Sequence, residues 1–277
     1  MDTTIFIAQP TYAGARVDSV IAAASMATAR YRFRYVSLGK SLLACNFNTL
    51  WTTALSDYEA GNCTHFAMLH PDITPDGFWV DLLMDQLERH RLDMISAVVP
   101  LKDARGLTST AVDRDQTGFH IRRLSLTEVY RLPEVFCKED TIEHGLNPAG
   151  LPLLVNTGCW LADLRNPRWF QCDALGRLVC SFTINDCVMR RPDDGRWFPK
   201  VESEDWWFSR RMHEVGLRYA ATRAVPLTHH GLGEYHNRGP WGSVEHEEDY
   251  LIQLPHGPAS TESPASTETL VATEALA

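Results

Sequence analysis

An apolar segment that ends on two side chains able to bind a metal ion is the most informative feature of this chain. Thr64–Leu69 is apolar, and His70-Pro71-Asp72 follows it directly. Side chains two residues apart on an extended chain share one face, and open α/β sheets bind phosphate-bearing ligands at the carboxyl ends of their strands. We therefore expect His70 and Asp72 to face a ligand. The same residues are also typical of a turn, because proline fixes its φ angle and aspartate closes Asx-turns.

Two adjacent acids, Glu204 and Asp205, begin a predicted helix behind Ser203. The helix dipole stabilises a carboxylate in the first turn, and a general base must be ionised and within reach of the proton that it removes. A carboxylate in this position could therefore serve as a base. The alternative is a helix N-cap followed by acidic residues, which many helices carry.

Two adjacent histidines, His229 and His230, precede Gly231, with Glu234 and His236 close by. A lone histidine after a strand is more often structural than a ligand, but this density of titratable side chains is hard to explain by packing, so the segment is a candidate metal site. Either histidine could be the ligand. A hydrolytic metal site is a rival explanation of the same residues.

The elements that must position these side chains alternate between strand and helix. The predicted order is β-α-β-α-β, over Thr4–Ala8, Val17–Arg30, Tyr31–Ser37, Leu42–Ala60 and Thr64–Leu69. This alternation predicts an α/β fold, Rossmann-like, with a mostly parallel sheet and helices on both faces.

The pattern continues less regularly. Further predicted elements are a helix at Gly77–His90, a strand at Asp93–Val99, a strand at Leu151–Leu161, a helix at Glu204–Gly216 and a strand at Leu217–Thr222. Residues 101–150 mix charged and proline-containing segments, which suggests an acceptor-side subregion or active-site loops. We expect one catalytic domain over residues 1–250, divided near residue 100 into a nucleotide-binding half and an acceptor-side half. Residues 251–277 are rich in Ser, Thr, Pro, Ala and Glu, which predicts a disordered tail.

Composition excludes several classes of function. The net charge of −9 argues against a protein that mainly coats nucleic acid or anionic membrane. The cluster Arg30, Arg32, Arg34 and Lys40 is interpreted as a solvated strand face. The seven cysteines form no C-x-x-C pair, and no signal peptide or transmembrane segment is evident. We expect a soluble, cytoplasmic protein with reduced thiols and no membrane insertion.

The order of these motifs resembles the GT-A fold nucleotide-sugar glycosyltransferases of the family 2 kind. In that family a D-x-D motif ends a strand, a glycine-containing strand lines the donor sugar, an E-D motif opens a helix, and a late histidine completes the metal site. The corresponding residues here are His70-Pro71-Asp72, Asn156-Thr157-Gly158, Glu204-Asp205 and His229. The resemblance covers roughly residues 3 to 245.

The resemblance implies a divalent cation, Mn²⁺ or Mg²⁺, that bridges the donor diphosphate. Asp72 would coordinate it, with His229 and His70 as the other candidate ligands. His70 replaces the first acid of the motif, and imidazole suits Mn²⁺ better than Mg²⁺. Alternatively, His70 contacts the ribose or the sugar, or packs.

The resemblance also implies that Asp205, beside Glu204, is the general base. It assigns donor binding to Pro10, Thr11, Tyr12, Asn48 and Gly158, besides His70 and Asp72. Tyr12 would stack on uracil, whereas Phe47 stands where many relatives carry an arginine that contacts the diphosphate. A glycine at position 158 would let the backbone approach the donor sugar, and a strand bulge explains it equally well.

We therefore expect a metal-dependent glycosyltransferase that moves a sugar from a UDP-sugar to an acceptor hydroxyl. An aspartate base predicts inversion at the anomeric carbon, and a retaining outcome stays open. The acceptor is a glycan, a protein, a small molecule or a modified nucleobase. The alternatives are a nucleotidyltransferase and a non-catalytic nucleotide- or glycan-binding module on the same scaffold.

Overall fold

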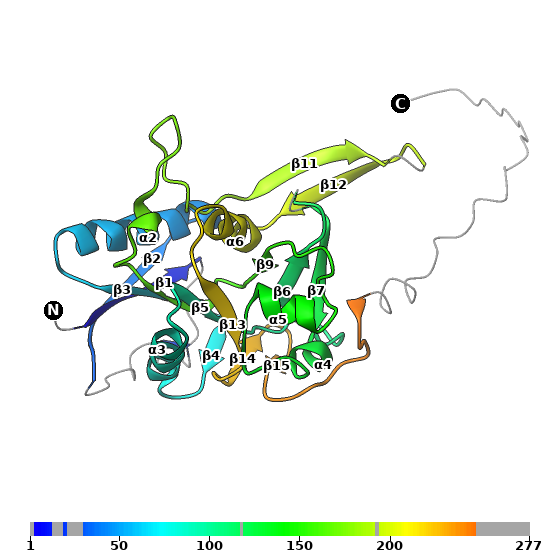
Figure 1. Cartoon of the computed structure of the whole chain (residues 1–277), viewed down its shortest axis with the longest axis horizontal. Coiled ribbons are helices and arrows are strands. Elements are labelled where there is room, and N and C mark those ends of the chain that lie inside the picture. The colour runs from blue at the N-terminus through cyan, green and yellow to red at the C-terminus, as the bar shows by residue number, and fades with distance from the viewer. Residues whose placement is uncertain (1–2, 13–18, 21–29, 117–118, 192–193, 248–277) are drawn as a thin grey trace, which may run out of the picture.

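The computed structural model describes residues 3–12, 19–20, 30–116, 119–191 and 194–247 (Figure 1). Within them, a seven-stranded sheet forms the centre of the molecule, in the order β2-β1-β3-β10-β5-β13-β8. Its strands are β2 (Arg32–Gly39), β1 (Thr4–Thr11), β3 (His65–Leu69), β10 (Cys159–Asp163), β5 (Met94–Ala97), β13 (Tyr219–Thr222) and β8 (Val135–Phe136). Only β10 and β8 run against the other strands of this sheet. The fold is mixed α/β with a mostly parallel, Rossmann-like central sheet.

Helices cover both faces of this sheet because the side chains of its strands alternate between two apolar layers. On β1, Phe6 joins the layer that contains Trp51 of α2 (Leu43–Glu59) and Phe208 of α6 (Glu204–Glu214). The neighbouring Ile5 joins the opposite layer, against α3 (Trp79–His90). Both faces of β1 are thus buried, as expected for a parallel strand between helices.

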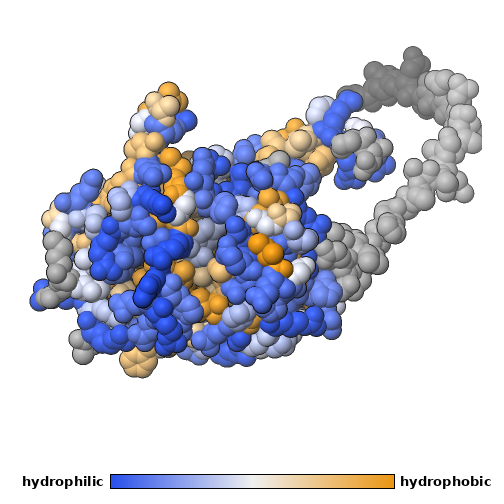
Figure 2. All heavy atoms as spheres, viewed as in Figure 1, coloured by the Kyte–Doolittle hydropathy of each residue, from blue (hydrophilic) through white to orange (hydrophobic). Residues whose placement is uncertain are grey.

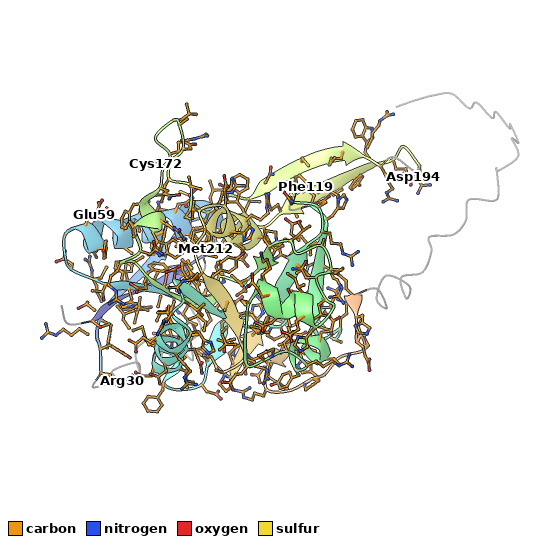
Figure 3. The ribbon with its side chains drawn as sticks, viewed as in Figure 1. Arg30, Glu59, Phe119, Cys172, Asp194 and Met212 are labelled. Carbon is orange, nitrogen blue, oxygen red and sulfur yellow. The ribbon has the colours of Figure 1, made fainter. Side chains whose placement is uncertain are left out.

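Aromatic rings dominate the layer beneath α2 and α6. Trp51 contacts Phe66 of β3 edge-on at 5.0 Å, and Phe182 stacks on Phe208 at 4.3 Å between ring centroids. Met212 of α6 lies at the centre of the molecule, whereas Asp194 lies at the tip of a projecting hairpin (Figure 3). Burial of these rings fixes α2 and α6 against the sheet, and therefore fixes the chain segments at their N-termini.

Smaller sheets and helices flank the central sheet. One sheet contains β4 (Ile73–Pro75), β14 (Leu227–His230) and β15 (Glu234–His236), and another contains β6 (Leu107–Asp113), β7 (Ile121–Ser125) and β9 (Leu153–Leu154). The strands β11 (Asn185–Arg190) and β12 (Trp197–Glu202) form the projecting hairpin. The short helices are α4 (Leu126–Val129), α5 (Lys138–Glu143) and the 3₁₀ helix Pro167–Phe170.

The surface in this view is mostly hydrophilic, with hydrophobic colour in places on the body and on two projections (Figure 2). These are the β11–β12 hairpin, with Val188 and Trp197 exposed, and the loop before it, with Leu175 exposed. None of the helices in the described ranges combines the length and the apolar character needed to cross a bilayer.

Most predicted elements agree with the structure to within a few residues, namely those at residues 4–8, 31–37, 42–60, 64–69, 77–90, 93–99, 204–216 and 217–222. The predicted strand Leu151–Leu161 is wrong. Its residues divide between β9 and β10, which belong to different sheets, and Asn156, Thr157 and Gly158 connect the two strands. Most of the predicted helix Val17–Arg30 and the whole of the predicted tail lie outside the described residues.

Candidate functional site

A cavity of about 430 Å³ opens at the carboxyl ends of β1 and β3, beside the start of α2. Its lining residues are Pro10, Thr11, Tyr12, Lys40, Ser41, Leu43, Asn46, Phe47, His70, Pro71 and Asp72. The structure thereby brings together the predicted donor-binding residues of two separate segments, Pro10 to Tyr12 and His70 to Asp72. Parallel strands place both segments at one edge of the sheet, where α/β folds bind ligands.

His70 lies against the aromatic layer at the inner side of this cavity. Its ring contacts Phe47 at 4.9 Å between centroids, and its backbone N–H donates to the Gly158 carbonyl at 2.7 Å. Burial lowers the pKa of His70 to about 4, so its imidazole is neutral at pH 7. The Nε2 atom is buried and has no hydrogen-bond partner among the residues that the structure describes.

Asp72 is held from two sides at the edge of the cavity. Lys102 forms an ion pair with its Oδ2 atom, and His229 Nε2 lies 3.5 Å from the same oxygen. Burial alone would raise the pKa of Asp72, but the hydrogen bonds from His229 and Lys102 outweigh it and keep the pKa well below its usual range. Asp72 is therefore ionised at neutral pH.

The two adjacent histidines have different partners. The Nδ1 atom of His229 bonds to the Pro100 carbonyl at 2.8 Å, which directs Nε2 toward Asp72. His230 is buried and bonds through Nε2 to Thr74 at 3.0 Å. Of the two imidazole rings, that of His229 is the one that meets the carboxylate of the predicted metal ligand Asp72.

The predicted three-ligand metal set is not assembled by these residues. The described residues contain no group of three or more His, Cys, Asp or Glu side chains placed to hold a metal ion. Asp72 and His229 meet, but they meet at the oxygen that Lys102 already contacts. The donor set alone therefore does not fit a resident divalent cation, and the assignment of Mn²⁺ or Mg²⁺ to Asp72, His229 and His70 stays a prediction.

Asp205 is the second residue of α6 and contacts the segment that joins β9 to β10. Asn156 Nδ2 donates to its Oδ2 at 3.0 Å, and the Thr157 hydroxyl donates to its Oδ1. Burial, followed by the nearby Glu204 carboxylate, raises the pKa of Asp205 to about 8. Burial also raises the pKa of Glu204, against a smaller lowering effect of the hydrogen bond from its own backbone N–H.

A chain of hydrogen bonds connects Asp205 to the cavity. Asn156, which donates to Asp205, accepts from the Gly158 N–H at 2.6 Å through its Oδ1 atom. The Gly158 carbonyl in turn accepts from the N–H of His70 at 2.7 Å. The predicted base and the predicted donor site are therefore parts of one connected arrangement.

Two predicted donor-binding residues have other partners. Asn48 bonds to the N–H and the carbonyl of Phe182, at 2.8 and 2.7 Å, and does not line the cavity. A Cβ atom on Gly158 would lie 2.6 Å from Ile73 Cδ1 and 2.7 Å from Asn156 Oδ1. Close packing behind His70 thus requires the glycine, and neither a strand bulge nor a bound sugar is needed to explain it.

Sequence analysis missed two lysines at this site. Lys40 lines the cavity and donates to Thr49 at 2.7 Å, although it was interpreted as part of a solvated strand face with Arg30, Arg32 and Arg34. Lys102 lies in the segment between β5 and β6 and belongs to no motif. Both follow the carboxyl end of a parallel strand, and that position is the signal that could have identified them.

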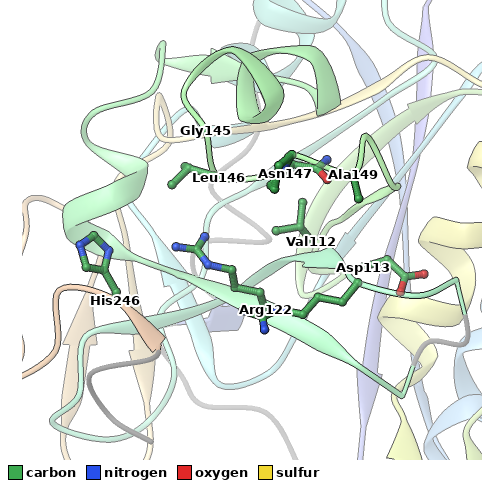
Figure 4. Close-up of a pocket in the computed structure, with 10 residues that line it drawn as sticks. Val112, Asp113, Arg122, Gly145, Leu146, Asn147, Ala149 and His246 are labelled. Atoms are coloured by element: carbon green, nitrogen blue, oxygen red, sulfur yellow. The ribbon is translucent and has the colours of Figure 1, made fainter. Parts of the chain in front are cut away.

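A larger cavity, about 780 Å³, lies in the half of the chain predicted to face the acceptor. Figure 4 shows Arg122 and His246 on one side of it and Asp113 on the other. Arg122 and His246 both contact the buried Glu128 carboxylate. No predicted site residue lines this cavity, so the smaller cavity is the candidate site.

Comparisons with known proteins give a structural likeness only. No family model matches the sequence, and no curated protein matches it significantly. Similar solved structures include the protein A197 from STIV, with a TM-score of 0.44 and 12% identity over 83% of this chain and 86% of that chain. A mutant of UDP-glucose pyrophosphorylase from Leishmania major has a TM-score of 0.40 and 10% identity. That match covers 80% of this chain and 62% of the other.

Proposed function

We propose that this protein is a GT-A type glycosyltransferase that moves a sugar from a UDP-sugar to an acceptor hydroxyl. One observation carries the proposal. Pro10 to Tyr12 and His70 to Asp72, which are far apart in sequence, line a single cavity at the carboxyl ends of two parallel strands. A nucleotide bound there would occupy the usual ligand position of a Rossmann-like sheet.

The chemistry of the lining suits a nucleoside diphosphate. Tyr12 is 79% exposed, so its ring is free to stack on a base. Helix α2 begins at the cavity without a side-chain cap and without an acidic residue in its first turn, which leaves backbone N–H groups for phosphate oxygens. Lys40 adds a positive charge to the same wall.

Asp205 is the proposed general base. In the transfer, the acceptor O–H proton moves to the Asp205 carboxylate while the acceptor oxygen bonds to the anomeric carbon. The bond between that carbon and the diphosphate breaks, and UDP leaves with the electron pair. One displacement of this kind inverts the anomeric carbon. Hydrogen bonds from Asn156 and Thr157 orient the carboxylate, and burial raises its pKa to about 8, which makes the ionised carboxylate a stronger base.

The test is release of UDP from a panel of UDP-sugars, with and without candidate acceptors. We expect slow release through hydrolysis, faster release with a suitable acceptor, and loss of both in Asp205→Asn. Binding of a UDP-sugar without any release would identify a non-catalytic binding module instead. Absence of binding to every UDP-sugar would refute the proposal.

A further inference from the structure

The fold holds Lys102 in a defined position beside the smaller cavity, where the donor diphosphate is proposed to bind. Its ammonium contacts Asp72, which lines the cavity, and the Lys102 side chain is 39% exposed. Along its length, the lysine passes close to Gly231, where a Cβ atom would lie 3.1 Å from both Cβ and Cδ of Lys102. Gly231 therefore leaves the room that this side chain fills.

Hydrogen bonds join the three segments that meet at Lys102. The His229 ring bonds to the carbonyl of Pro100, two residues before the lysine, at 2.8 Å. The N–H of His230 donates to the carbonyl of Asp72 at 2.8 Å. The segment after β5, the turn after β3 and strand β14 are thus fixed to one another, and Lys102 is directed to Asp72 by the fold.

The lysine has the donors that a phosphate needs. An ammonium group carries three N–H donors, and the ion pair with Asp72 uses one of them, which leaves two for phosphate oxygens. A divalent cation bound to Asp72 Oδ2 would have to share that oxygen with an ammonium, against like-charge repulsion. The described residues offer no third His, Cys, Asp or Glu ligand to offset this cost.

We propose that Lys102, held by Asp72, supplies the positive charge at the donor diphosphate, so that the nucleotide binds without a divalent cation. This inference rests on the proposed function, and it puts the lysine in place of the divalent cation that the resemblance implies. Asp72 is then a positioning residue for the lysine. Lys40, which lines the cavity just before α2, contributes a second positive charge.

The decisive experiment is calorimetric titration of UDP into the full-length protein, in excess EDTA and in Mn²⁺. We expect the Kd in EDTA to match the Kd in Mn²⁺ within about twofold. Lys102→Gln should weaken UDP binding by about tenfold or more in both buffers, the usual scale for a charge-assisted hydrogen bond. Lys102→Arg should restore most of it.

The matched control is Lys138→Gln, since Lys138 forms a surface ion pair with Glu139 and does not line this cavity. This variant should bind UDP as the wild type does. Tenfold tighter binding in Mn²⁺ than in EDTA, or unchanged or tighter binding by Lys102→Gln, would overturn the inference. The buffer comparison uses the wild type alone and so decides the matter even if a variant does not fold. No binding in either buffer would instead refute the proposed function, and this inference with it.

Discussion

Replacing Asp205 by asparagine tests whether this residue acts as the general base or only stabilises the start of α6. Both carboxylate oxygens accept hydrogen bonds, from Asn156 and Thr157, in a site where Asp205 is 9% exposed. Asparagine keeps the shape, and the Thr157 hydroxyl can rotate to accept from the new amide. If Asp205 is the base, transfer should fall by a factor on the order of 10² or more while UDP affinity stays unchanged. If it is only a first-turn acid of α6, the change should cost roughly 1 kcal/mol or less and leave transfer intact.

The pH dependence of transfer gives an independent readout. The pKa of Asp205 is raised to about 8, chiefly by burial and then by the Glu204 carboxylate. Transfer by the wild type should therefore rise about tenfold per pH unit below pH 8 and level off above it. Glu204→Gln removes the second cause, so it should retain transfer and shift this rise to lower pH. Loss of transfer in Glu204→Gln, together with retained transfer in Asp205→Asn, would instead make Glu204 the base.

The free energy of unfolding should fall as the pH rises, whereas the rate of transfer should rise. The pKa of Asp205 in the folded protein lies above its ordinary value of 3.8. The protonated group therefore stabilises the fold fully below pH 3.8, and this stabilisation is lost as the pH rises to about 8. The slope for one such group is at most about 1.4 kcal/mol per pH unit. The unfolding free energy of Asp205→Asn, relative to that of the wild type, should therefore increase by about 1–3 kcal/mol between pH 5 and pH 7. Urea denaturation at both pH values measures the gain, and a constant difference would refute the assigned burial effect.

Other substitutions test individual contacts. Tyr12→Ala should weaken UDP binding by about 5- to 150-fold through lost stacking, whereas Trp197→Ala, a control at another exposed aromatic, should not. Asn48→Ala should lower the unfolding free energy by about 1–3 kcal/mol, because it leaves the buried polar groups of Phe182 unpaired. The affinity for UDP should stay unchanged, and a weaker affinity would show that Asn48 belongs to the donor site. Gly158→Ala should cost about 1–3 kcal/mol by overpacking, and a variant as stable as the wild type would contradict the close contacts described.

Local patterns in the sequence predict much of the fold. The apolar segment before His70, the helical periodicity before Gly61 and the acids at the start of α6 all reflect neighbouring residues, and the corresponding elements are present. The meeting of Tyr12 with His70 and Asp72 was also predictable, because parallel strands end at one edge of a sheet.

Non-local partners explain what the sequence could not predict. Leu151–Leu161 is mostly apolar, but the chain changes sheets within it, where the side chains of Asn156 and Thr157 bond to Asp205. Asn48 bonds to Phe182, which is 134 residues away in sequence. Lys102 acquires its position only when Asp72 and His229 fold against it. No spacing within one segment encodes these contacts.

Filling the smaller cavity with a large side chain tests most directly the central claim, that the nucleotide binds there. Ser41 lines it and is exposed, so Ser41→Trp should fill it with an indole ring without disturbing the core. Ser56→Trp is the matched control, because Ser56 is exposed on α2, the helix that follows Ser41, about 20 Å from the start of that helix by helix geometry. Titration of UDP should show binding to the wild type and to Ser56→Trp, and at least about 100-fold weaker binding to Ser41→Trp, a loss of about 2.7 kcal/mol. Wild-type affinity in Ser41→Trp would place the nucleotide elsewhere and contradict the proposed site.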